Sequence, residues 1–334
     1  MLLLHRRHVR HLRREGRLLS ERVLVTGALG CVGAWAVKAA LEDGHDAVGY
    51  DLGDSRHRLD PILSEEERGR LTLVQGDITD LGAFGRTLDE HEITRVVHLA
   101  ALQVPSCRAD PALGARVNVV GTVNVFEAVK GRLATIPGVA YASSAAVYGP
   151  DDPSPAPESG GTNPATIYGV YKLANEGTAR LYHAEWGVPS VGIRPYVVYG
   201  PGRDQGMTAG PTQAMAAAAR GEGYAIGYGG SAQYDFAPAV GRAFVTASGV
   251  SEGAVAANFP GVRATMAEVV AAIEAAAPDA AGRITWAEAT LPFPAQLEAR
   301  ALEAAIGPVQ QPTLASGVAD TVRALGERRP PHDV

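Results

Sequence analysis

The sequence predicts an α/β protein with a doubly wound parallel sheet and a smaller C-terminal lobe. Short β-branched segments alternate with longer amphipathic ones, a pattern typical of parallel strands joined by crossover helices. A glycine-rich turn, TGALGCVG, follows the first such strand and begins a helix. Asp51 ends the second strand, the place where a Rossmann-type sheet binds a nucleotide ribose.

The strands of this sheet are expected along the first part of the chain, at residues 23–25, 45–51, 71–77, 94–101, 139–144 and 188–195. Helices are expected between them, at 32–42, 113–130 and 167–186. Because parallel neighbours need a crossover connection, these helices cover the faces of the sheet.

The pattern becomes less regular after Pro195. A glycine-rich segment extends to about residue 230, and helices are expected near 265–277 and 314–326. We therefore predict a nucleotide-binding domain at 21–195 and a substrate-binding lobe at 196–330, interleaved with it. The proline- and glycine-rich stretch 149–164 follows the strand that ends in serines, and we expect it to form a loop over the site.

Composition indicates an ordinary globular protein, with 46% hydrophobic and 20% charged residues. The net charge of -6 disfavours nucleic acid as a partner. Cys31 and Cys107 are the only cysteines, so we expect no disulfide and no metal site, and a reducing cytoplasm fits best. No apolar run reaches the roughly 18 residues of a membrane span, so no integral membrane contact is expected.

Residues 1–20 differ from the rest, because they hold six arginines and a single acidic residue. We expect a disordered basic extension or a start site upstream of the true one. The alternative is a short amphipathic helix that touches an anionic surface.

The spacing of Gly27, Gly30 and Gly33 predicts a dinucleotide-binding turn. Glycine permits a tight turn and close approach of a pyrophosphate, to which the helix N-terminus presents N–H groups. Asp51 lies 18 residues after Gly33. A carboxylate there accepts from ribose hydroxyls and repels a 2′-phosphate, so NAD is favoured over NADP. Two arginines close by, Arg56 and Arg58, argue the other way.

Two further polar residues have both a functional and a structural interpretation. Asp77, followed by Ile78, can accept from an adenine amino group or cap the next helix. Asn118 is unfavourable inside a helix, which suggests that it holds a proton-relaying water near Lys172; otherwise it is a surface amide. His98 and His183 show no triad or metal spacing, and we expect structural roles for both.

Tyr168 and Lys172 lie four residues apart, and Ser144 lies 24 residues before the tyrosine. An ammonium group near a phenol favours the phenolate and lowers its pKa. The tyrosine can then accept a proton from a substrate alcohol while the carbon gives up hydride, and the serine hydroxyl holds the developing carbonyl oxygen.

Between residues 21 and 328 the chain resembles the extended short-chain dehydrogenase/reductase family, in particular the NAD-dependent epimerase/dehydratase branch that includes UDP-glucose 4-epimerase-like proteins. The resemblance rests on VTGALGCVG, GYDLGD, GDITD, HLAA, NVVGTVNVFEA, ASSAAVYG, YGVYKLANE and IRPYVVYGPG, in this order.

The resemblance implies roles for individual residues. Tyr168 would be the catalytic base, Lys172 its pKa-lowering partner, Ser144 the holder of the reacting oxygen and Asn118 the support of a water. The cofactor NAD would contact Gly27, Leu29, Gly30, Cys31, Val32, Gly33, Asp51, Asp77, Ile78, Leu99, Ala100, Ala101, Tyr168, Lys172 and Pro195. The substrate would contact Ser143, Ser144, Gln103, Tyr196 and Arg203. A homodimer would form through helices 113–130 and 167–186.

The substrate side departs from the nucleotide-sugar members of the family. Those members usually have an asparagine three residues after the arginine of the sixth strand, where Val197 stands here. Ala232 and Ala239 occupy positions where they often have an arginine and an aspartate. A diphosphate needs such donors, although Arg203 or Arg242 could replace them from another direction.

We therefore expect a NAD-dependent epimerase that transiently oxidises a secondary hydroxyl of a sugar or sugar-like substrate, which need not be a nucleotide sugar. The alternative is a net dehydrogenase or reductase of a non-nucleotide sugar, uronate or polyol. A catalytically silent NAD-binding protein is a minor alternative.

Overall fold

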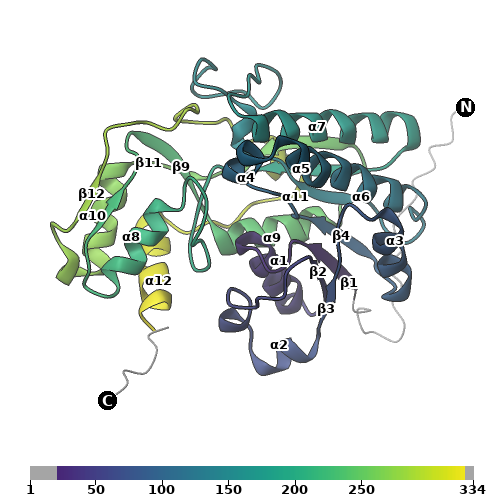
Figure 1. Ribbon diagram of the computed structural model, residues 1–334, viewed down its shortest axis with the longest axis horizontal. Coiled ribbons are helices and arrows are strands. Elements are labelled where there is room, and N and C mark those ends of the chain that lie inside the picture. Colours follow the sequence, from purple (N-terminus) through teal and green to yellow (C-terminus); the bar gives the residue numbers. More distant parts are fainter. Residues whose placement is uncertain (1–20, 328–334) are drawn as a thin grey trace, which may run out of the picture.

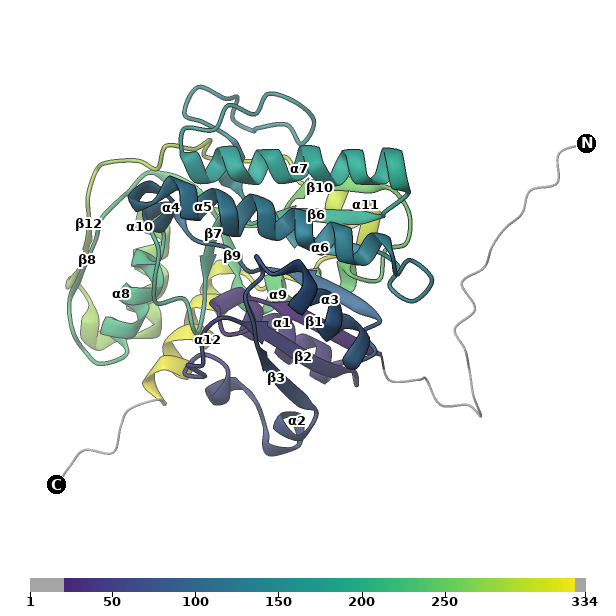
Figure 2. The same cartoon turned by 45° about the vertical axis from the view of Figure 1, so that its right-hand side comes forward.

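The computed structural model describes residues 21–327; the predicted basic extension at 1–20 lies outside the described residues. Seven parallel strands form its central sheet in the order β10-β6-β5-β4-β1-β2-β3 (Figures 1 and 2). This confirms the predicted doubly wound fold. The strands are β1 (Arg22–Thr26), β2 (Asp46–Asp51), β3 (Leu71–Gln75), β4 (Arg95–His98), β5 (Val139–Ala142), β6 (Ser190–Arg194) and β10 (Ala254–Asn258).

Helices cover both faces of the sheet because successive strand residues point to opposite sides. Val23 and Val25 face a core with α1 (Cys31–Glu42) and α9 (Ala237–Ala247). Leu24, between them, faces a second core with α3 (Leu81–Glu90), α6 (Gly121–Lys130) and α7 (Ile167–Trp186). The carboxyl ends of the strands stay open between these two layers.

The helix expected at 113–130 is interrupted. It consists of α5 (Pro111–Ala115), a π-helical segment (Arg116–Val120) and α6, after a short α4 (Val104–Ala109). Asn118 lies at the centre of the π-helical segment. Such segments are frequent at functional sites, and nothing in the apolar spacing of the sequence indicated this one.

The smaller lobe has its own apolar core, seen at the left of Figure 1. Its helices are α8 (Gly210–Ala218), α10 (Met266–Ala276) and α12 (Leu314–Gly326), and its strands are β7 (Val197–Tyr199), β8 (Tyr224–Ile226), β9 (Ser231–Phe236), β11 (Val262–Thr265) and β12 (Ile284–Trp286). Short elements elsewhere are η1 (Asp60–Ile62), α2 (Glu65–Gly69), η3 (Ala145–Val147), η4 (Pro278–Ala280) and α11 (Ala301–Ile306).

The chain after Pro195 contributes to both lobes. β10 pairs with β6 at the edge of the central sheet, and α9 packs against α1, whereas β7 and β9 pair with each other in the smaller lobe. The domain boundary at residue 195 stays a prediction, and β10 and α9 lie beyond it although they pack with the first domain.

The expectation that residues 149–164 cover the site is wrong, since none of them lines the main cavity. The carboxylate of Glu158 accepts from the backbone N–H groups of Asn258, Arg300 and Ala301. These bonds hold the loop against β10 and α11 instead.

Among the helices of residues 21–327, none has the length and apolarity that a membrane span requires.

Candidate active site

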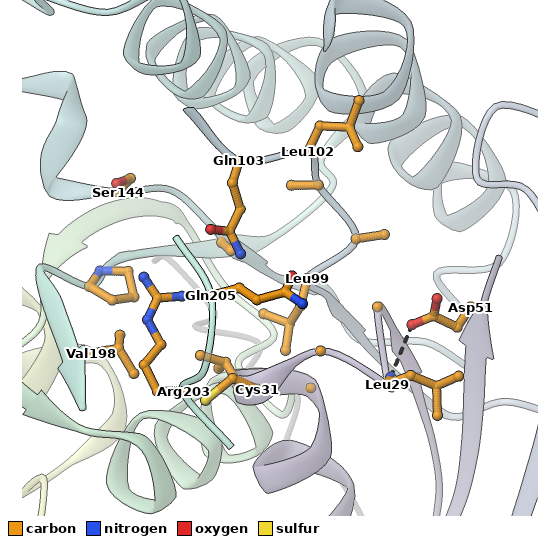
Figure 3. Close-up of a pocket in the computed structure, with 18 of the residues that line it drawn as sticks. Leu29, Cys31, Asp51, Leu99, Leu102, Gln103, Ser144, Val198, Arg203 and Gln205 are labelled. Carbon is orange, nitrogen blue, oxygen red and sulfur yellow. Dashed lines mark hydrogen bonds between the residues drawn. The ribbon is translucent and has the colours of Figure 1, made fainter. Parts of the chain in front are cut away.

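A cavity of about 570 Å³ opens at the carboxyl ends of β1, β4 and β5 and is lined by both lobes (Figure 3). Every residue predicted to bind cofactor or substrate lines it, and of the predicted catalytic residues only Asn118 does not. Side chains that sequence reasoning did not select also line it, including Val198, Gln205, Met207, Thr208 and Phe293.

The glycine turn closes one end of the cavity through close backbone packing. Gly27 has φ +68°, and a Cβ on Gly33 would lie 1.9 Å from the carbonyl oxygen of Gly27. Gly30 begins α1 without a side-chain cap, so the first N–H groups of the helix are free to meet an anion. These features fit the pyrophosphate of a dinucleotide.

Asp51 is held beside this turn. Its carboxylate accepts from the N–H of Leu29 at 2.9 Å and of Gly53 at 3.1 Å, and the first of these bonds is drawn in Figure 3. The nearby arginines are engaged elsewhere: Arg56 pairs with Asp60, and Arg58 pairs with Asp204. This arrangement suits a ribose with a free 2′-hydroxyl better than one with a 2′-phosphate.

Asp77 does not cap the next helix, and its contact with an adenine amino group stays a prediction. One carboxylate oxygen accepts from the N–H and the hydroxyl of Thr79, both at 2.8 Å, which is a local turn. The residue nevertheless lines the cavity together with Ile78. The cap of α3 is Asp80, whose side chain accepts from Ala83.

His98 holds the end of β4 and takes no part in an ionisable cluster. Its Nδ1 lies 2.8 Å from the hydroxyl of Thr26, and its Nε2 lies 3.1 Å from that of Thr122. The Thr26 hydroxyl accepts from the N–H groups of Leu99 and Ala100. Burial, helped by the charge of Lys172, lowers the pKa of His98 to about 3, so the ring is neutral.

The three catalytic candidates come from β5 and α7. The Ser144 hydroxyl accepts from the N–H of Ala146 and so starts the short helix η3. Thr166 caps α7, which places Tyr168 and Lys172 in its first turns, one above the other. The ammonium of Lys172 is buried, donates to the carbonyl oxygen of Ala142 at 2.7 Å, and lies 5.5 Å from the centre of the Tyr168 ring.

The expectation that Lys172 lowers the pKa of Tyr168 is not met. Burial raises the pKa of Tyr168 to about 12, and the opposing influences are a hydrogen bond with Ser144 and the charge of Arg203. Lys172 turns its ammonium to Ala142, and burial lowers its own pKa to about 8. The phenol is therefore protonated at neutral pH, and its pKa responds to the charges around the cavity.

Asn118 is buried below the cavity wall. Its side-chain oxygen accepts from the N–H of Leu102 at 2.7 Å, and its amide donates to the carbonyl of Leu102 at 2.9 Å and contacts the Cys107 sulfur. Its side chain clamps the loop that carries Gln103. The predicted role in holding a water stays a prediction.

Ser143 lines the cavity, but its hydroxyl has a protein partner. Its hydroxyl donates to Glu176 on α7 at 2.5 Å. Glu176 receives Nε and Nη2 of Arg194, both at 2.7 Å, in an ion pair whose side chains are only 8% and 4% exposed. The contact of Ser143 with substrate stays a prediction, and the observed contact joins β5, β6 and α7.

The other end of the cavity is built by the loop between β7 and α8. Figure 3 shows Arg203 and Gln205 extending from this loop, with Gln103 opposite. The suggestion that Arg242 supplies a donor is wrong, because it pairs with Glu42 and Asp43 on the outer side of α1. Ala232 and Ala239 are buried in apolar cores and do not line the cavity.

Residues 23–241 match the model of the "NAD dependent epimerase/dehydratase family". A UDP-glucose 4-epimerase of Mycolicibacterium smegmatis is 38% identical over 191 residues, which cover 57% of this chain and 60% of that protein. UDP-glucuronate 4-epimerase 1 of Arabidopsis thaliana is 34% identical over 186 residues, covering 54% and 43%. The chain thus spans about half the length of these curated relatives.

Solved structures match over nearly the whole chain. UDP-glucose 4-epimerase of Thermus thermophilus in complex with NAD is 25% identical, with a TM-score of 0.76 over 91% of this chain and 98% of that one. A holo L-threonine dehydrogenase of Cupriavidus necator is also 25% identical, with a TM-score of 0.78 over 91% and 99%.

Proposed function

Because the chain belongs to the NAD-dependent epimerase/dehydratase family, we propose that it is an epimerase that transiently oxidises a secondary hydroxyl of a sugar or sugar-like substrate. One observation carries this proposal. Tyr168, Lys172 and Ser144 line the same cavity as the glycine turn and Asp51. A substrate alcohol beside Tyr168 would therefore meet the cofactor that the turn holds.

The residues of this chain would move one proton and fix one oxygen. NAD held by the glycine turn and Asp51 would supply the hydride acceptor for the oxidation and the hydride donor for its reversal. The Ser144 hydroxyl would hold the substrate oxygen, and the Tyr168 oxygen would take the proton of the substrate alcohol and give it back to the keto oxygen. Burial raises the pKa of Tyr168 to about 12, so the resting group is a phenol and a weak acid. It would have to release its own proton to solvent before it could take the proton of the substrate alcohol, and the phenol formed in that step would return the same proton to the keto oxygen.

A net dehydrogenase or reductase is the second candidate. It is favoured by the likeness to L-threonine dehydrogenase over 91% of the chain. The burial of Ala232 and Ala239 away from the cavity favours a non-nucleotide substrate for either candidate, since no diphosphate anchor comes from these two positions.

Tyr168→Phe tests the catalytic proposal. It removes only the hydroxyl, so we expect turnover to fall by about 10²- to 10⁴-fold while NAD binding, measured by calorimetry, is retained. Unchanged turnover would remove Tyr168 from the mechanism, and a wild type without turnover on any candidate substrate would support a non-catalytic NAD-binding protein.

The two candidates differ in how they use the cofactor. Freshly purified protein is denatured, and the released small molecules are identified by mass spectrometry. Near-stoichiometric NAD supports an epimerase, which regenerates its cofactor in each cycle. A largely empty protein supports a dehydrogenase, which exchanges NAD for NADH.

We also propose a homodimer through residues 113–130 and 167–186. Several large apolar side chains on these helices are exposed: Leu113, Val120, Ile167, Val170, Leu181 and Trp186. The helices lie side by side in both views (Figures 1 and 2), and a grouped apolar surface of this kind is typical of an interface. Sedimentation of the Val170→Glu/Leu181→Glu variant should give a monomer; an unchanged mass would contradict the proposal.

A further inference from the structure

Arg203 brings a positive charge to the cavity that the described part of the chain does not balance. Its Nη2 donates to the hydroxyl of Thr208 at 3.1 Å. Its Nε is buried and has no hydrogen-bond partner, and within residues 21–327 no carboxylate forms an ion pair with it. A buried donor without a partner is costly, so this guanidinium is suited to an anion that enters the cavity.

The other basic side chains that line the cavity already have partners. Arg58 donates three hydrogen bonds to the carboxylate of Asp204, from Nε and Nη2, and also donates to the carbonyl of Leu29. Lys172 donates to the carbonyl of Ala142. Among the described residues that line the cavity, the guanidinium of Arg203 is therefore left to pair with a charged ligand.

The surroundings of Arg203 place it at the substrate end. Its charge acts on the Tyr168 hydroxyl, and in Figure 3 it points past Val198 toward the side where Ser144 lies. A Cβ on Gly206 would lie 3.1 Å from Nη2 of Arg203 and 2.2 Å from Oε1 of Gln103. The guanidinium and the Gln103 amide therefore both border the space beside Gly206.

We propose that the substrate is a hydroxy acid whose single carboxylate binds Arg203 while its secondary hydroxyl faces Tyr168. The proposal rests on the function proposed above and names its substrate class. A guanidinium offers two parallel donors that match one carboxylate. A nucleotide diphosphate carries about two charges, and the cavity wall has no second unpaired lysine or arginine among the described residues to meet them.

Calorimetric titration of the NAD-loaded protein tests the proposal directly, without relying on turnover. The ligands are D-glucuronate and D-gluconate as sugar acids, L-threonine as a hydroxy amino acid, D-glucose as a neutral sugar, and UDP-glucose. The variants are Arg203→Met, Arg203→Lys and, as a matched control, Arg242→Met, which removes an arginine paired on the outer surface.

We expect at least one of the carboxylate ligands to bind the wild type and the Arg242→Met control with equal affinity. D-glucose should bind both proteins at least 10-fold more weakly. Arg203→Met should lower the affinity for the carboxylate ligand by about 10- to 100-fold, which is the contribution of a hydrogen bond to a charged group. The affinity for NAD should stay unchanged. Arg203→Lys should fall between, because it keeps the charge and loses the paired donors. Which carboxylate binds distinguishes a sugar acid from a hydroxy amino acid.

Three results would overturn the inference. The first is that UDP-glucose binds more tightly than every carboxylate ligand. The second is that Arg203→Met lowers the affinity for NAD and not that for the carboxylate ligand. The third is that Arg203→Met changes the affinity for none of the carboxylate ligands. Turnover of a neutral or nucleotide sugar that requires Tyr168 and is indifferent to Arg203→Met would refute only the substrate class. Carboxylate binding without any Tyr168-dependent turnover would refute only the proposed function.

Discussion

Replacing Glu176 by glutamine tests how firmly a buried ion pair fixes the catalytic segment. Glu176 lies one turn after Lys172 on α7 and receives two bonds from Arg194 of β6, each 2.7 Å long. The Ser143 hydroxyl donates to the same carboxylate. The variant therefore loosens the junction of β5, β6 and α7 beside Ser144.

Burial sets the expected magnitude. The side chains of Glu176 and Arg194 are 8% and 4% exposed, so neutralising the carboxylate leaves a guanidinium that water solvates poorly. Removing one partner of such a pair costs about 3–5 kcal/mol. Because glutamine keeps one acceptor oxygen, and Arg194 also donates to Tyr148, we expect a loss of about 3 kcal/mol in the free energy of unfolding.

Urea unfolding followed by circular dichroism measures this loss. Asp89→Asn is the matched control, since Asp89 receives Nε and Nη2 of Arg132 at the same distances of 2.7 Å, but its side chain is 63% exposed. We expect the control to lose far less stability, because water solvates the freed arginine. Equal losses in the two variants would refute the reasoning that burial decides the strength of these pairs.

Three further predictions concern charges that line the cavity. Burial lowers the pKa of Lys172 from 10.5 to about 8, so the unfolded chain holds this proton more tightly. The folded protein should therefore gain up to about 3 kcal/mol of stability as the pH rises from about 8 to about 10. Urea unfolding at two pH values should show this gain in wild type and not in Lys172→Met. Asp51→Asn should lower the affinity for NAD by about 10-fold and reduce the ratio of NAD affinity to NADP affinity. Titration of the protein with both cofactors measures this ratio, and an unchanged ratio would argue against a contact between Asp51 and the ribose. Asp204→Asn frees Arg58 from the pair that joins the loop after β2 to the loop before α8, and we expect stopped-flow fluorescence to show several-fold faster release of NADH than from wild type.

The sequence predicted those parts of the fold that repeat a local pattern. The strands 45–51 and 139–144 and the helices 32–42, 167–186 and 314–326 were expected within a few residues of their observed bounds, because alternating apolar segments and capping residues specify them locally. β10 was missed as the seventh strand. Its sequence, AVAAN, carries little strand signal, and pairing with β6 decides its structure. The π-helical segment around Asn118 also depends on contacts, here with Leu102.

The candidate site likewise contains residues that a local sequence pattern identifies and features that depend on the fold. Residues of the glycine turn and the Tyr168–Lys172 pair could be selected because their chemistry requires a fixed local spacing. The direction of the Ser143 hydroxyl toward Glu176 could not be selected, since the partner lies 33 residues away. The pKa of Tyr168 was expected to fall, but burial raises it, and the ammonium of Lys172 donates to Ala142. Both the burial and the direction of this ammonium are set by the fold and not by the local sequence.

The two ends of the cavity are therefore built differently. The cofactor end is made of backbone, where Gly33 leaves no room for a side chain, and any protein that binds a dinucleotide in this way needs the same glycines. The substrate end is made of side chains on loops, among them Arg203 and Gln103, which can change without disturbing the sheet. A family match consequently identifies the cofactor more securely than the substrate. Within residues 21–327 the guanidinium of Arg203 has no carboxylate partner, and its charge is the feature from which substrate class can be argued.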